Sequence, residues 1–160
     1  MKYVFCLIFL CCVIPSPAQN FVTNEGEFMD TVSAGSPAGE SIPLWYYSVG
    51  GKYPRSSATL LKEVKAFTEK SANPYAGSGY ITFRFIIDTT GRMLKKVQVL
   101  QTDEQYKSHH FDKALVNTLF AYVKTLNKWS IARPVPGRAF PYHAYLTFKM
   151  KNGKVITIIP

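Results

Sequence analysis

The chain has little cysteine, and none beyond residue 12. Cys6, Cys11 and Cys12 are the only three in the 160-residue sequence, and all lie in a short apolar run near its start. If that run is removed, the rest of the chain has no disulfide, no thiolate metal site and no cysteine nucleophile. We therefore expect the protein to be held together by its hydrophobic core.

The apolar run itself is too short for a typical membrane span. Val4 to Ile14 comprises 11 residues, which as a helix would cover roughly 16 Å of a ~30 Å hydrocarbon core. Lys2 precedes the run and Ser16-Pro17-Ala18 follows it, which is typical of a secretory signal cut after Ala18. We expect residues 1–18 to be a signal peptide and the mature chain to have no stable membrane span. A retained anchor and a lipid on Cys12 are the alternatives.

Basic residues are missing from the next segment. Residues 19–45 contain four acidic residues and no Lys or Arg, whereas residues 46–160 hold 18 Lys and Arg against 6 Asp and Glu. We expect residues 19–52 to form a flexible acidic leader and residues 53–160 to form the folded domain. In an exported protein this basic charge favours an acidic protein segment or an anionic envelope polymer over nucleic acid as the partner. A surface that only keeps the domain soluble is the other interpretation.

Hydrophobic periodicity predicts the first half of the domain. Ser56-Ser57 is expected to cap a helix that runs to about Lys70 with one apolar stripe. Alternating residues then predict an antiparallel hairpin with strands Tyr80 to Asp88 and Met93 to Gln101. Its turn is Asp88-Thr89-Thr90-Gly91, where Gly91 takes a positive φ.

The second half repeats these signals. Ser108 is expected to cap a helix that ends near Trp129, and Tyr142 to Met150 alternates again as a strand. Asn152-Gly153 is a strong hairpin signal, with Val155 to Ile159 as the return strand. The order of helices and strands predicts an α+β fold, a two-layer sandwich in which an antiparallel sheet packs on two helices.

A stiff connector joins the second helix to the third strand. We expect Trp129 to close the end of the core, with its indole N–H left free at the rim. Pro134 and Pro136 are expected to hold the connector extended, and Gly137 to permit the turn into the strand. These residues have structural rather than chemical roles in this interpretation.

Three runs, "GYITFRFIIDTTGRMLKKVQVLQ", "FDKALVNTLFAYVKTLNKW" and "ARPVPGRAFPYHAYLTFKM", together resemble the C-terminal domain of TonB-type proteins. The likeness extends over about Tyr53 to Met150. That family has a glycine-led strand, a D-x-x-G turn, a V-x-V strand, a D-x-A-L helix ending in Trp, a Pro-rich connector with Gly, and a strand ending in F-K. The matching residues are Gly79, Asp88, Gly91, Val97, Val99, Asp112, Ala114, Leu115, Trp129, Pro134 to Gly137, Phe148 and Lys149.

The resemblance implies a protein-binding module that has no cofactor and is not an enzyme. TonB-like domains pair an extended segment of an outer-membrane transporter, near its N-terminus, to a sheet edge, which implies a periplasmic or exported protein of the Gram-negative cell envelope. The accepting strand would be Tyr142 to Met150, with His143, Tyr145, Thr147 and Lys149 pointing outward. The Asn152-Gly153 hairpin either creates a new edge or closes this one.

The resemblance is incomplete at the start of the chain. Energy-transducing members carry a membrane helix and a long Pro-rich spacer, where this sequence has a signal-like run and a short acidic leader. We therefore expect that the chain does not transduce energy on its own.

Residues suited to catalysis or metal binding are few. His109 and His110 are adjacent, so on a helix they point about 100° apart and do not chelate one ion together. Asp103-Glu104 has no nucleophile beside it. We expect no enzymatic activity and no metal site.

An aromatic triplet, Trp45-Tyr46-Tyr47, supplies the alternative function. Flat aromatic rings stack well on sugars, so the triplet predicts binding of an envelope glycan such as peptidoglycan. The structural alternative is that the three rings pack back onto the domain as a lid.

Overall fold

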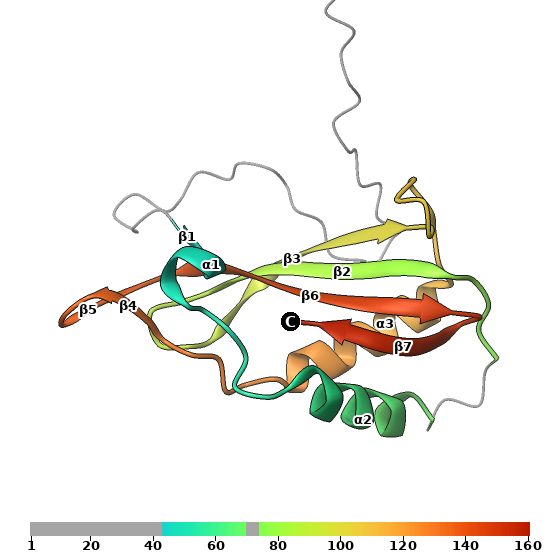
Figure 1. Cartoon of the computed structure of the whole chain (residues 1–160), viewed down its shortest axis with the longest axis horizontal. Helices are drawn as coiled ribbons and strands as arrows, with labels where there is room; N and C mark the ends of the chain where they lie inside the picture. Colours follow the sequence, from blue (N-terminus) through green and yellow to red (C-terminus); the bar gives the residue numbers. More distant parts are fainter. Residues whose placement is uncertain (1–42, 70–73) are drawn as a thin grey trace, which may run out of the picture.

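The computed structural model describes residues 43–69 and 74–160. The predicted signal peptide and residues 19–42 of the predicted leader lie outside this range. In the described part, a five-stranded sheet and a separate two-stranded hairpin are accompanied by three helices (Figure 1). In chain order the elements are β1 (Leu44–Trp45), α1 (Tyr46–Val49), α2 (Ser57–Thr68), β2 (Gly79–Ile87), β3 (Met93–Thr102), α3 (Lys113–Thr125), β4 (Ala132–Val135), β5 (Arg138–Phe140), β6 (Tyr142–Lys151) and β7 (Lys154–Ile159).

The sheet is built around β2 and β6. β2 pairs antiparallel with β3 on one side and with β6 on the other. The far side of β6 is shared by two short strands: β1 pairs parallel with Tyr142–His143, and β7 pairs antiparallel with Thr147–Lys151. The predicted α+β class is confirmed, and so are the two long hairpins. The sheet is mixed rather than purely antiparallel because of β1.

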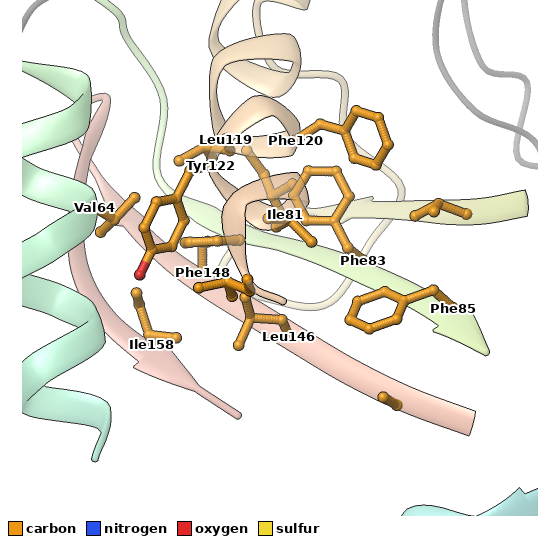
Figure 2. Close-up of a cluster of buried hydrophobic side chains, with 14 of the residues drawn as sticks. Val64, Ile81, Phe83, Phe85, Leu119, Phe120, Tyr122, Leu146, Phe148 and Ile158 are labelled. Atoms are coloured by element: carbon orange, nitrogen blue, oxygen red, sulfur yellow. The ribbon is translucent and has the colours of Figure 1, made fainter. Parts of the chain in front are cut away.

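One face of the sheet forms the core with the two long helices. Every second residue of β2, from Gly79 to Ile87, is buried, and the same alternation holds in β6. Figure 2 shows these strands meeting α2 through Val64 and α3 through Leu119 and Tyr122. Burial of each large apolar side chain stabilises the fold by roughly 1.5–3 kcal/mol before entropy is subtracted. The described residues contain no cysteine, so within them the core acts without disulfides.

The two helix starts have different outcomes. Ser56 caps α2 as predicted, since its hydroxyl accepts the N–H of Thr59. The predicted cap at Ser108 is wrong: Asp112 caps α3 by accepting the N–H groups of Ala114 and Leu115. Residues 108–111 are held against β3 instead, because Ser108 bridges Thr102 and the Gln101 side chain accepts the N–H of Phe111. A helix therefore begins only after this extended stretch.

Trp129 closes the end of the core as predicted, but its N–H is not free. The ring is 6% exposed and lies edge-on to Tyr53 and Phe85. Its Nε1 donates to the Leu126 carbonyl at 2.9 Å. α3 ends at Thr125, earlier than predicted, and the last carbonyls of a helix need partners from outside it. The indole supplies one of them.

The Pro-rich connector is a small hairpin of its own. β4 pairs with β5, and Pro136-Gly137 forms the turn between them. Gly137 has φ 76°, which confirms the predicted turn. Pro134 lies inside β4 and has no N–H to donate. Both strands of a two-stranded ribbon are edge strands, where proline is tolerated. The predicted extended conformation of the connector is thus confirmed in β4. The pairing of β4 with β5 was not predicted.

The folded unit starts before the predicted boundary at Tyr53. β1 is hydrogen-bonded to the sheet, and the Leu44 N–H donates to the Pro141 carbonyl at 2.9 Å. Gly51 is buried so close to the Tyr142 ring that a Cβ there would overlap it. Residues 44–52 therefore belong to the domain rather than to the leader.

We expect Gly91→Val to destabilise the β2–β3 hairpin. Gly91 has φ 81°, and a Cβ would lie 2.9 Å from the Trp129 carbonyl oxygen. The turn is otherwise well satisfied, because an Asp88 carboxylate oxygen accepts the N–H groups of Thr90 and Arg92. The free energy of unfolding should fall by more than about 1 kcal/mol. Urea unfolding followed by circular dichroism measures it, and an unchanged midpoint would contradict the turn assignment.

Candidate binding surfaces

The strand predicted to accept a partner is not an edge. β6 has β2 along its full length on one side, with β1 and β7 at the two ends of the other. The prediction of an open edge at Tyr142 to Met150 is therefore wrong. Its physical cause is the type I′-like turn at Asn152 (φ 48°) and Gly153 (φ 72°), which folds the chain back as β7. The predicted contact residues His143, Tyr145, Thr147 and Lys149 do point away from the helices, as expected, and are half-buried.

β3 is one open edge of the sheet, and β7 is another. Within the described ranges, no strand pairs with β3 on its outer side, and β7 pairs with β6 alone, so the Asn152-Gly153 hairpin creates a new edge while it covers part of β6. At its end, the Gln101 carbonyl accepts the N–H of His109, and the Asp103 N–H donates to Lys107. In an antiparallel ladder outward groups recur at every second residue. The outward N–H and C=O groups of β3 therefore belong to Val99 and Val97, and no described backbone group bonds them.

A pocket borders this edge on the helix side. It has a volume of about 520 Å³ and lies between the start of β3 and the end of α3. The Lys124 ammonium lies 4.9 Å from the centroid of the Phe120 ring at its wall. No carboxylate lines it, and the lining residues are Arg92, Met93, Leu94, Val97, Phe120, Lys124, Leu126 and Asn127. The pocket is apolar with a basic rim.

The outer sheet face carries a second surface, which we call the aromatic surface: Trp45, Tyr46, Tyr47, His143 and Tyr145. Trp45, Tyr46 and Tyr47 are 43%, 38% and 70% exposed, so all three side chains are accessible to solvent and none belongs to the core. The triplet thus packs on the sheet, as the structural alternative predicts, and keeps its rings accessible.

Three of the five rings of the aromatic surface share a similar orientation. Trp45 lies 6.3 Å from Tyr47 at 5° and 6.4 Å from Tyr145 at 17°, while Tyr46 stands edge-on to Tyr145 at 61°. The Arg84 guanidinium lies 5.7 Å from the Trp45 ring centroid. Burial raises the pKa of the Tyr145 phenol, and the charge of Arg84 opposes this rise. Tyr145 therefore stays a neutral hydroxyl at ordinary pH.

A hollow opens beside these rings, where β1 and β7 leave an interval on β6. Its volume is about 380 Å³. It is lined by Trp45, Tyr46, Tyr47, Tyr145, Thr147, Ile159 and Pro160. The sequence named the aromatic triplet and Tyr145 separately, but only the fold brings them together.

Sequence reasoning missed Arg84 and Tyr106. Arg84 is an outward residue of β2 whose register places it directly opposite Tyr145. Tyr106 lies in the loop after β3 and stacks on Tyr80 at 5.0 Å, with the Lys149 ammonium 5.8 Å from the Tyr80 ring centroid. The outward alternation of β2 was the available signal for Arg84, whereas no local pattern marks Tyr106.

The remaining candidates have local roles. His109 and His110 precede α3 rather than starting it, and His109 lies edge-on to Phe111. Asp103 accepts the N–H groups of Gln105 and Lys107, which closes its own loop. Across residues 43–69 and 74–160, no three His, Cys, Asp or Glu side chains are grouped to hold a metal ion. No helix in the same ranges is both long and apolar enough to cross a membrane.

Comparisons of the chain with protein-family models, with curated proteins and with solved structures find no match.

Proposed function

We propose that this chain is an exported, non-enzymatic binding module similar to the C-terminal domain of TonB-type proteins. It captures an extended segment of an envelope protein by strand addition. The helix–hairpin–helix–strand order on one sheet supports the likeness. The accepting strand differs from the one that the likeness implies, because β7 and β1 cover β6.

The open outer side of β3, next to an apolar pocket, carries this proposal. An edge strand offers unpaired N–H and C=O groups, and an added strand gains affinity from them. Alternate side chains of that strand point toward the helix side, where the pocket beside Val97 and Phe120 lies. Backbone pairing and a side-chain pocket thus act at the same place.

The pocket's chemistry indicates what the partner segment contains. Arg92 and Lys124 are the charged residues of a mostly apolar lining that also includes Asn127 and has no carboxylate. A suitable segment alternates apolar residues with acidic or neutral polar ones and lacks proline where its N–H must pair. We propose the N-terminal segment of an outer-membrane transporter in the periplasm of a Gram-negative cell as such a partner.

The test is a titration of the protein with synthetic peptides taken from the N-terminal segments of outer-membrane transporters. Each peptide is matched by a copy in which every second backbone nitrogen is methylated, which removes hydrogen-bond donors while keeping the side chains. We expect saturable binding by at least one unmodified peptide, weaker binding at high salt, and about tenfold or greater loss on methylation. Equal affinity for both copies would contradict strand addition, and no binding by any peptide would contradict the transporter assignment.

A further inference from the structure

The aromatic surface is not used by strand addition at β3. It lies around β1 and the start of β6, with β2 between it and β3. We propose that it is a separate binding site for an acidic oligosaccharide, a glycan whose sugar rings carry carboxylates. Ring geometry, local rigidity and the sign of the charge support this site independently.

Ring geometry suits sugars. A pyranose presents a face of C–H groups that packs on an aromatic ring, while its hydroxyls stay at the edge and need polar partners. Trp45, Tyr47 and Tyr145 lie within 17° of a common orientation, as measured from Trp45. Thr147 and three tyrosines, residues that carry hydroxyl groups, line the hollow beside them, and the Thr147 hydroxyl also bonds that of Thr82. Apolar faces and hydroxyl partners are therefore both at hand.

The rings are held in place before any ligand binds. Trp45 belongs to β1, and its carbonyl accepts the Ser48 hydroxyl at 2.7 Å. The Tyr46 carbonyl accepts the Gly51 N–H at 2.8 Å, which closes the turn of α1. His143 contacts Trp45 from the sheet side with ring centroids 5.1 Å apart. A rigid surface loses little conformational entropy on binding, which favours affinity.

The charged side chain that adjoins these rings is basic: the Arg84 guanidinium lies over Trp45. The outward positions of β2 and β6 carry Arg84 and Lys149 but no Asp or Glu. Gln98 orients Arg84, since its side-chain oxygen accepts an N–H of the guanidinium at 3.2 Å. A guanidinium above Trp45 favours a carboxylate on a sugar stacked beside it. It also disfavours an ammonium ligand, because a second cation over the same ring would be repelled.

The probe is a four-sugar chain of galacturonic acid, compared with its fully methyl-esterified form, which has the same rings without the charge. Trp45 is 43% exposed and Trp129 is 6% exposed, so a change in tryptophan emission on titration reports mainly on the aromatic surface. We expect the acid form to bind and the ester to bind about tenfold more weakly. Isothermal calorimetry gives the affinities independently.

Matched variants separate this site from general attraction to a basic protein. Trp45→Ala leaves every charge in place and should weaken the acid form about tenfold or more in calorimetry. Tyr106→Ala removes another exposed aromatic ring, 73% exposed and in the loop after β3, and should leave binding unchanged. Arg84→Gln should bring the acid and ester forms to similar affinity.

Three results would overturn the proposal. One is the absence of binding by the acid form at millimolar concentration. Another is equal binding by the parent protein and Trp45→Ala, which would assign the attraction to net charge. The third is binding of tetramethylammonium with the same dependence on Trp45, which would make the surface a cation site. None of these affects the peptide titration at β3, so the two sites are tested separately.

Discussion

Val99→Pro should weaken capture of an extended peptide about tenfold or more relative to Val99→Ala. The outward N–H of Val99 lies midway along the open edge of β3, and proline removes this donor. Because that N–H faces away from β2, proline does not break the ladder inside the sheet. The measurement is the dissociation constant of one peptide for both variants.

Alanine is the matched control because the Val99 side chain is itself buried, 3% exposed against the helices. Both variants lose packing, and only proline loses the donor. Cooperative thermal unfolding of each variant shows that the fold is kept. Equal affinities would mean that side chains, not the β3 backbone, hold the partner. If Val99→Pro does not fold, the N-methylated peptides still test backbone pairing, because they remove hydrogen-bond donors from the partner instead of from β3.

Short-range patterns account for the part of the fold that was predicted. The alternation in β2 and β6 is long and regular, so a shift of one residue would expose Phe83 and Phe148 together. Asn152-Gly153 adopts the positive φ angles of a tight hairpin, which few other residue pairs do. These signals depend on neighbours in sequence, and they were read correctly.

Long-range contacts account for the errors. β1 is two residues long and pairs with Tyr142–His143, which lie about a hundred positions later in the sequence. No local sequence pattern predicts such a pairing. The Ser108 cap was wrong because Gln101, on another element, holds the chain extended through Phe111. The prediction of a free Trp129 N–H was wrong because α3 ends at Thr125, which leaves the Leu126 carbonyl within hydrogen-bond distance of the indole.

The candidate site was misplaced for a related reason. The sequence identifies β6 as a strand and β7 as its return, but whether β7 covers the edge depends on its register and length. β7 and β1 between them leave only residues 144–146 of β6 without a strand partner on that side. We therefore propose strand addition at β3, the open edge that the apolar pocket borders, while the outward residues of β6 remain as a surface of side chains.

Gly79→Ala should cost about 3 kcal/mol or more of the free energy of unfolding. Gly79 opens β2 with φ 145°, a conformation that side-chain-bearing residues rarely adopt. An added Cβ would overlap the Thr102 carbonyl oxygen and lie 2.8 Å from the Asp103 Cα. Both are backbone atoms of the neighbouring strand and its loop, so neither moves aside without opening the β2–β3 pairing.

Gly137→Ala is the control that separates strain from overlap. Gly137 also has a positive φ, 76°, but a Cβ there meets no atom within 4 Å. Its substitution should cost only the backbone strain, about 1 kcal/mol. Urea unfolding of both variants measures the difference. Equal losses of stability for the two variants would mean that β2 does not approach Thr102 as closely as described. They would also contradict the β2–β3 register that places Val97 and Val99 at the open edge.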